Sequence, residues 1–210
     1  RNHSSAASDV YKRQIWDMSG LDYLNGPRPD TVNPSLWRQA QLNAIYGLFQ
    51  VTDRIYQIRG FDLANMTLIE GDTGWIIVDP LTATETVRAA MEVVDKHFGK
   101  RPIKAILSTH SHVDHFGGIR ALANEEDLAS GKIRFVAPAG FVEEAASENV
   151  IAGNAMGRRA TYMFGNLLPP TVQGNVDSGL GKGVAFGTIS LLTPTDVITA
   201  TGQKLVLDLS

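Results

Sequence analysis

The sequence predicts an α/β protein, and two observations support this fold class. Short runs rich in β-branched residues alternate with segments whose apolar residues recur at helical spacing. Hydrophobic residues make up 43% of the 210 residues and charged residues 20%, which is typical of one globular domain with a sizeable core. The net charge of -3, without a segment rich in Lys and Arg, argues against nucleic acid as a partner.

Both ends of the chain differ from its middle. Residues 1–14 are polar, show no apolar period and do not begin with Met, so we expect a non-native or disordered tail and place the folded part at 15–210. Residues 202–208 alternate like a strand that stops without a closing turn, which predicts that the chain is the front portion of a longer protein. No apolar run approaches the ~20 residues that cross a bilayer, so no membrane span is expected.

The first half of the folded part is predicted to be a helix followed by a sheet. Asn33 and Pro34 form a helix-start signal and Gly47 a stop, which predicts a helix near 34–46. Four β-rich runs follow at 48–51, 55–58, 64–69 and 75–78, and a glycine-containing turn joins the last two. These runs predict an antiparallel meander.

The second half alternates helices with strands. Thr82 and Glu85 match a capping box, and apolar residues continue one helical face until Gly99. Further along we expect a strand at 103–107, a helix starting at 119–123, a strand at 133–136 and a helix at 141–147. Residues 151–184 hold much glycine without a clear period, which predicts a long connection with some helix that lies over a site.

Residues 179–183, with the sequence Gly-Leu-Gly-Lys-Gly, look like a phosphate-binding loop but do not fit one. The first glycine of a P-loop would fall at Val176, and Gly183 stands where the motif has Ser or Thr. Nucleotide binding is therefore not expected.

Three of the five histidines lie within six residues, and this cluster predicts a metal site. His110, His112, Asp114 and His115 follow the strand at 103–107, where α/β enzymes commonly place their chemistry. Residues two apart in an extended loop project the same way, so His110 and His112 can bind one ion, and Asp114 and His115 a second. Cysteine is absent, so imidazole and carboxylate must supply the ligands. Two adjacent ions would lower the pKa of a bridging water, which predicts hydrolysis.

The segment 109–118 resembles the H-x-H-x-D-H signature of the metallo-β-lactamase superfamily, and Asp79, after the strand at 75–78, matches an earlier strand-end aspartate of that superfamily. The resemblance implies a four-layer αββα sandwich, of which this chain would hold the front portion. Segments 33–81, 148–169 and 179–183 are more specifically similar to the alkyl sulfatases that hydrolyse detergent esters such as dodecyl sulfate. This likeness extends over almost everything from Met18 onward, and the long extra segments point to the sulfatase branch.

The resemblance also implies roles for single residues. His110 and His112 would bind one zinc ion, Asp114 and His115 the other, with Asp114 also a candidate catalytic carboxylate, while Asp79 would brace the ligand loop by hydrogen bonding. Two glutamates and a histidine that complete the family's site come later in the chain, and no histidine follows His115 here, so we expect this fragment alone to be inactive. The resemblance further implies a homodimeric parent protein that is periplasmic or secreted in bacteria.

Two residues of the segment 158–166 are candidates for binding the substrate. Tyr162 offers a hydroxyl and Arg159 a guanidinium, both suited to an anionic sulfate. The alternative is that Tyr162 packs and that the arginine is solvated or paired structurally.

Three functions remain open from the sequence. The leading one is a zinc-dependent hydrolase that divides a small alkyl sulfate ester into alcohol and sulfate. A second is another hydrolase of the same fold, acting on a lactam, lactone or thioester, although the insert at 149–183 is not expected in a compact lactamase. The third is a non-catalytic metal-binding module.

Overall fold

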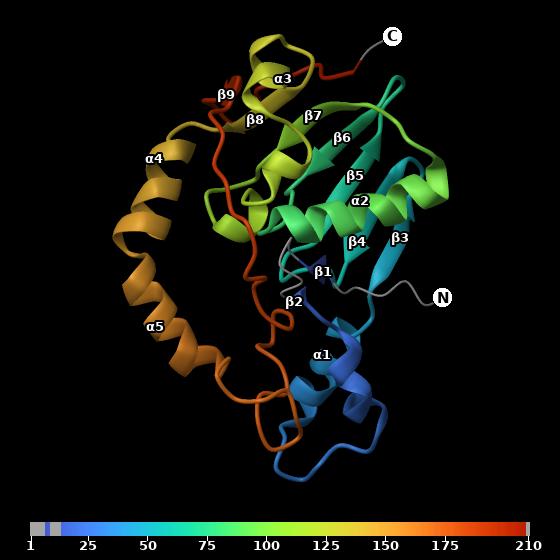
Figure 1. The fold of residues 1–210 in the computed structure, drawn as a ribbon, viewed down its shortest axis with the longest axis vertical. Helices are drawn as coiled ribbons and strands as arrows, with labels where there is room; N and C mark the ends of the chain where they lie inside the picture. The colour runs from blue at the N-terminus through green and yellow to red at the C-terminus, as the bar shows by residue number, and fades with distance from the viewer. Residues whose placement is uncertain (1–6, 9–13, 209–210) are drawn as a thin grey trace.

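The computed structural model describes residues 7–8 and 14–208. Its centre is a seven-stranded sheet in which every strand lies beside the strands that precede and follow it in the sequence (Figure 1). The strands are β3 (Gly47–Thr52), β4 (Ile55–Arg59), β5 (Met66–Glu70), β6 (Trp75–Val78), β7 (Ile103–Leu107), β8 (Arg134–Pro138) and β9 (Asp196–Ile198). The first four strands are antiparallel, as predicted, and β6 to β9 are parallel. The α/β class predicted from the sequence is therefore confirmed.

Helix α2 (Thr84–Phe98) lies across one face of the sheet and forms the larger core with it (Figure 1). Trp75, Ile77 and Met66 of the strands are fully buried against Val87 and Val94 of the helix. Within the described residues, one large sheet with this helix is present, and the second sheet of a four-layer sandwich is not among them. This agrees with the prediction that the chain holds part of that fold.

A second core lies under β7 and β8. Phe135 and Ile106 of the strands pack with Phe116, Ile119 and Phe141. These three residues belong to the loop and short helices that follow β7 and β8, so this core supports the segment that carries the histidines. The surrounding helices are η2 (Val113–His115), η3 (Ile119–Ala121), α3 (Glu125–Ala129) and α4 (Phe141–Ala146).

Two helices precede the sheet, and α1 is shorter than predicted. Helix η1 spans Ser19–Asn25 and α1 spans Pro34–Asn43. Asn33 caps α1 by accepting a hydrogen bond from the Ser35 amide, at 2.8 Å, which confirms the predicted start. The tail predicted at 1–14 falls mostly outside the described residues, although β1 (Ala7–Ser8) pairs with β2 (Gln14–Trp16).

Three predicted elements are wrong in detail. The capping box is absent because Thr82 and Glu85 bond to other segments, and α2 begins at Thr84 after Ala83. The helix expected from 119 is a single 3-10 turn, η3. Residues 202–208 form no strand, and the last strand is instead β9.

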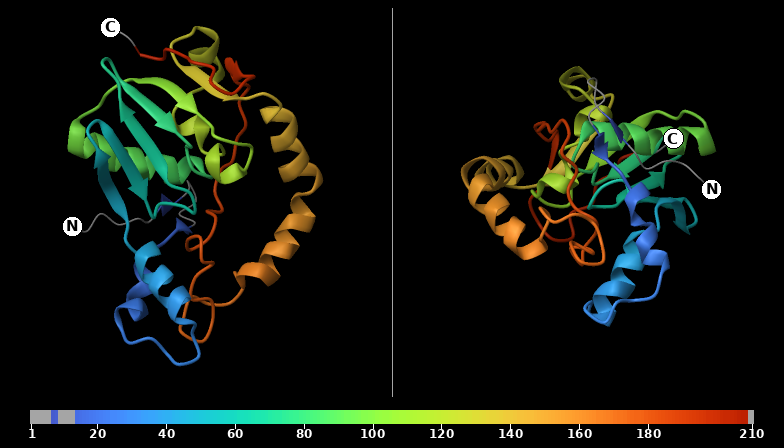
Figure 2. Two further views of the ribbon diagram at one scale, coloured as in Figure 1. Left: turned by 180° about the vertical axis from the view of Figure 1, so that it is seen from behind. Right: turned by 60° about the horizontal axis from the view of Figure 1, so that its bottom comes forward.

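The segment predicted as a long connection contains the π-helical turn η4 (Ser147–Ile151) and helix α5 (Gly153–Phe164). Together with α4 they form an outer arc, and the chain then returns without regular structure beside the sheet to β9 (Figure 2). In the described residues, no helix combines the length and apolarity that a membrane crossing needs.

Candidate metal centre

The four predicted ligands follow the parallel strand β7, whose end is fixed by its neighbour. The Ser108 amide donates to the Val136 carbonyl of β8 at 3.0 Å, and the Ser108 hydroxyl donates to the carbonyl of His115 at 3.2 Å. The second bond draws the start and the end of the histidine loop together. The loop is therefore held from both sides of the ligand cluster.

Asp79, to which the resemblance assigns a bracing role, forms hydrogen bonds with this loop. It follows β6 with a positive φ of 57°, a conformation that non-glycine residues rarely adopt. Its buried carboxylate accepts hydrogen bonds from the amide and the hydroxyl of Thr109, at 2.8 Å each, and contacts Nδ1 of His115 at 2.9 Å. A carboxylate on Nδ1 orients the imidazole and leaves Nε2 as the nitrogen that can bind a metal.

His115 and Asp114 have the geometry of two ligands of one ion. Nε2 of His115 lies 3.3 Å from Oδ2 of Asp114. Two ligands that each sit ~2.0–2.2 Å from a tetrahedral zinc ion are about 3–3.5 Å apart, so a cation fits between them. Burial lowers the pKa of His115, but hydrogen bonds with Asp114 and Asp79 outweigh it and raise the pKa to about 9. Burial raises the pKa of Asp114. The hydrogen bond with His115 lowers this pKa by a larger amount, so the pKa lies below its ordinary value.

His110 and His112 lie beside this pair. The ring of His110 is 4.1 Å from the ring of His115 and 4.6 Å from that of His112. Burial, followed by the nearby charges of His115 and His112, lowers the pKa of His110, which favours the neutral form that binds metals. The three imidazoles therefore gather at one edge of the sheet, as the sequence predicted.

Glu148 is a neighbour of the cluster that sequence reasoning missed. Its Oε1 lies 3.1 Å from Nε2 of His112. Glu148 belongs to the π-helical turn η4, a rare conformation that occurs often at functional sites. No spacing rule connects residues 112 and 148, but a carboxylate at the start of the sulfatase-like segment 148–169 was a signal that could have found it.

Across residues 7–8 and 14–208, no three His, Cys, Asp or Glu side chains converge on one point as a complete ligand set. The predicted ligands instead contact carboxylates in pairs, His115 with Asp114 and His112 with Glu148. Imidazole and carboxylate can hold a metal ion, and each pair would need more ligands to close a site.

Gly117 and Gly118 are required by close packing behind the ligand loop. A Cβ atom at Gly117 would lie 2.2 Å from the Thr82 carbonyl oxygen, and one at Gly118 would lie 2.5 Å from that of Pro80. The Gly118 amide donates to the Leu81 carbonyl at 3.0 Å. The two glycines therefore let the ligand loop dock on the turn that carries Asp79.

A cavity of about 730 Å³ opens beside the ligands. Its polar lining includes His112, Asp114, His115 and Glu148, and its apolar lining comes from Leu63, Met156, Met163, Phe164, Leu180 and Val184. Arg159 lines it as well, so the structure brings this predicted substrate residue to the site. Tyr162 is 92% exposed on α5 and is not part of this lining.

The fold and the ligand loop agree with a comparison to known families. Residues 59–204 match the metallo-beta-lactamase superfamily. The chain belongs to this superfamily. The matched region contains Asp79, all four predicted ligands and the walls of the cavity.

The relatives with the most informative names point to one branch of this superfamily. A linear primary-alkylsulfatase from Pseudomonas sp. is 52% identical over 196 residues, and the alkyl/aryl-sulfatase BDS1 of Saccharomyces cerevisiae is 47% identical over 195 residues. Each alignment covers 92% of this chain. The solved structure of the stereoselective inverting sec-alkylsulfatase Pisa1 from Pseudomonas sp. superposes with a TM-score of 0.92 at 46% identity and covers 98% of this chain.

The chain is much shorter than these proteins. It spans 29% of the Pseudomonas relative, 30% of the yeast relative and 33% of the Pisa1 chain.

Proposed function

We propose that the full-length protein is a zinc-dependent hydrolase of alkyl sulfate esters such as dodecyl sulfate. The observation that carries this proposal is the cavity whose lining combines predicted metal ligands and Arg159 with many apolar side chains. An alkyl sulfate combines the same two characters, with an anionic head and an apolar tail. The similarity to alkylsulfatases supports the same substrate class.

The chain's own residues have separable tasks in this proposal. Two zinc ions, when bound, would polarise the ester and supply a nucleophile derived from water. Asp79 fixes the orientation of His115 by contacting its Nδ1, and the carboxylate of Asp114 lies beside Nε2 of the same ring. Arg159 lines the cavity and would pair with the sulfate oxygens, because a guanidinium offers several fixed N–H donors to an anionic group. Leu63, Phe164 and Leu180 exclude water from the alkyl chain.

The cavity is large enough that the proposal can be tested with substrates of increasing alkyl chain length. Each CH₂ group that leaves water for an apolar wall contributes about 0.8 kcal/mol, or roughly fourfold in affinity. For the full-length protein we expect KM to fall by about this factor for each added carbon in a series of primary alkyl sulfates from hexyl to dodecyl, until the walls are filled. Steady-state kinetics with sulfate release as the readout measures it, and product analysis in ¹⁸O-labelled water identifies the bond that breaks.

The same measurements can also contradict the proposed function. Hydrolysis of a β-lactam, lactone or thioester without any sulfate release would replace this proposal by the second function considered from the sequence. Zinc content is measured in parallel, because two equivalents per chain are expected of the complete protein.

We also propose that the full-length protein is a homodimer without a nucleic-acid partner. The net charge of -3 supports the second part. Exposed apolar residues on and after α5 support the first, among them Met163, Leu167 and Leu168, which are 56%, 80% and 55% exposed. Sedimentation equilibrium of the full-length protein decides its oligomeric state.

A further inference from the structure

Asp62 is a buried carboxylate that plays no part in the metal centre. It lies in the connection between β4 and β5 and is 4% exposed. Burial raises the pKa of this carboxyl, and hydrogen bonds from backbone amides oppose that effect. A charged group is costly to bury without partners, so the partners of Asp62 show what it does.

Five hydrogen bonds converge on this carboxylate from three segments. The amides of Leu63, Thr82 and Ala185 donate to it at 2.8, 3.0 and 3.1 Å. The hydroxyls of Thr82 and Thr86 donate at 3.0 and 3.1 Å. The three amides and the Thr82 hydroxyl donate to the carboxylate, while the single proton of the Thr86 hydroxyl is shared between Asp62 and the Ala83 carbonyl, which lies 2.9 Å away.

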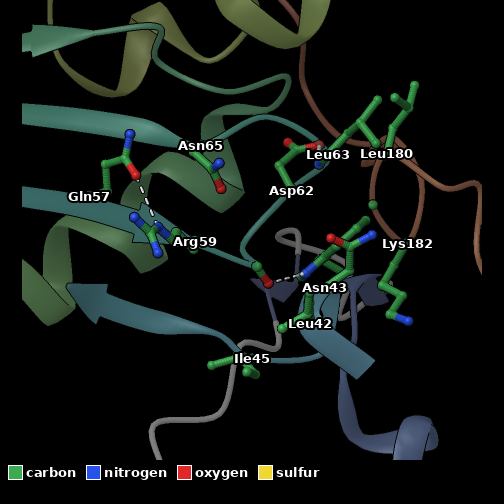
Figure 3. A pocket seen from close by; sticks show the side chains of 13 residues that line it. Leu42, Asn43, Ile45, Gln57, Arg59, Asp62, Leu63, Asn65, Leu180 and Lys182 are labelled. Atoms are coloured by element: carbon green, nitrogen blue, oxygen red, sulfur yellow. Dashed lines mark hydrogen bonds between the residues drawn. The ribbon is translucent and has the colours of Figure 1, made fainter. Parts of the chain in front are cut away.

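Two of the three segments belong to the wall of the metal-side cavity. Leu63, Ala64 and Asn65 follow Asp62 directly and line that cavity, and Val184, next to Ala185, lines it from the returning chain. Leu63 and Leu180 also line a smaller cavity of about 270 Å³, and Asp62 itself is part of that lining (Figure 3). Asp62 thus ties together two segments that line the metal-side cavity.

The third segment is the start of α2, which serves as the fixed support. Thr82 and Thr86 are fully buried against the larger core. The nearby turn that carries Asp79 has anchors of its own, because the Asp79 amide donates to the Leu107 carbonyl at 2.8 Å and Gly118 bonds to Leu81. Loss of Asp62 would therefore free the cavity wall while the metal ligands stay in place.

We infer that Asp62 is a positioning residue that fixes residues 63–65 and 184–185 as one wall of the substrate cavity. This inference rests on the proposed sulfatase function. A wall that contacts the non-reacting part of a substrate binds the ground state and the transition state equally. Its displacement raises KM and leaves kcat unchanged.

The test compares two variants of the full-length, zinc-loaded protein. In Asp62→Asn one accepting oxygen becomes an NH₂ group that faces donors. Either the bonds of Oδ1 to Leu63 and Ala185 or the bonds of Oδ2 to the start of α2 are therefore lost, and in both cases the wall is no longer tied to the helix, at nearly constant volume. The matched control is Asp196→Asn, which alters a carboxylate that bonds to Arg134 and Thr195 at β9, outside the cavity lining. We expect KM for dodecyl sulfate to rise on the order of tenfold in Asp62→Asn, with kcat and zinc content within about twofold of the parent, and neither constant to change in the control.

A second variant covers the case in which Asp62→Asn does not fold. Thr82→Val keeps the shape of a buried side chain and deletes one of the five donors. It should raise KM in the same direction by a smaller factor. An unchanged KM in the variant that folds would overturn the inference. A fall in kcat and zinc content in proportion to the loss of folded protein would overturn it as well.

Amide hydrogen exchange separates this inference from the proposed function. If the parent protein releases no sulfate, the proposed function fails, and exchange of the amides at 63–65 and 184–185 then decides the role of Asp62. Faster exchange in both segments of Asp62→Asn, but not of Asp196→Asn, supports the inference. Unchanged exchange in either segment overturns it.

Discussion

His115 is held between two carboxylates, while His112 is held from one side only, by Glu148. His112 is also the more exposed of the two, with 57% of its side chain in solvent against 23%. Removal of the His112 ring should therefore cost little folding free energy. The same ring is one of the predicted ligands on which metal binding would depend.

We accordingly expect His112→Ala in the full-length protein to lose nearly all activity and at least part of its zinc, with a far-UV circular dichroism spectrum like that of the parent. Zinc content by atomic emission and sulfate release are the measurements. Turnover near the parent's level would remove His112 from the ligand set. His97→Ala is a suitable control, because His97 packs on Phe98 at the end of α2, away from the cluster.

Arg159 and Arg158 are adjacent on α5, but only Arg159 lines the cavity. Arg159→Ala should therefore raise KM for dodecyl sulfate on the order of tenfold or more, since it removes a charge-assisted contact, while Arg158→Ala removes the same charge with little effect. Equal effects of the two variants would show that Arg159 acts only through its positive charge and makes no specific contact with the sulfate.

Tyr162→Phe tests the other predicted substrate residue in the same assay. The sequence predicts a loss on the order of 10²–10³ in kcat, the usual cost of one preorganised donor. Its 92% exposure on this chain means that such a loss would require another part of the full-length protein to bring substrate to it. Turnover equal to the parent's would remove Tyr162 from the predicted substrate residues and leave Arg159.

The four predicted ligands were found because they lie close together in the chain, whereas Asp79, 36 positions from His115, was found only through the family resemblance. His110, His112, Asp114 and His115 were predictable because six residues contain the whole pattern. Asp62 and Glu148 were not predicted, because their roles come from contacts 123 and 36 positions away, with Ala185 and His112. Only the folded chain brings those positions together.

At the scale of elements, α2 is joined to the returning chain by its first turn. Glu85 accepts hydrogen bonds from the Thr188 amide and hydroxyl, at 2.8 and 2.6 Å. Burial raises the pKa of Glu85, but these bonds lower it below the ordinary value of 4.5 overall. The side chain that the sequence assigned to a capping box thus holds a segment outside the helix.

A depressed pKa gives this bond a defined pH dependence. Stabilisation by Glu85 is present above about pH 4.5 and is lost as the pH falls through the folded-state value. We expect Glu85→Gln to lower the free energy of unfolding on the order of 1 kcal/mol at about pH 7, and by less at about pH 3. Urea denaturation at both values measures this difference. A constant difference across that range would contradict a charge-dependent bond.

Strands were predictable from the sequence where a β-rich run of four or more residues marked them, as for β7, which was predicted at its observed bounds of 103–107. β3 to β6 are joined by short connections, and their apolar patterns located them to within about two residues. β9 was missed because it has three residues and pairs only with β8, with help from the Asp196 contact to Arg134. Residues 202–208 alternate more regularly, but pairing and not alternation decides which segment becomes a strand.

At the scale of the whole molecule, the described chain brings together ligand pairs that need further ligands. Metal affinity depends on ligand number and on how well the ligands are preorganised. Isothermal titration of the 210-residue chain with zinc should therefore show much weaker binding than the full-length protein, and the chain should release no measurable sulfate from dodecyl sulfate. Two tight sites in the shorter chain would show that residues 1–210 already hold complete sites.

The order of the strands in the sheet has a consequence for synthesis on the ribosome. Each strand from β4 to β6 pairs antiparallel with the strand made just before it, across a short connection, whereas β9 pairs with β8 across the whole segment between Pro138 and Asp196. Local antiparallel pairing closes short loops and forms quickly, while parallel pairing across long connections is slower. The histidine loop follows β7, and the core that supports it includes Phe135 and Phe141, which are made after the loop. The antiparallel half of the sheet can therefore form early in translation, and the histidine loop gains its full support only when β8 and α4 have emerged.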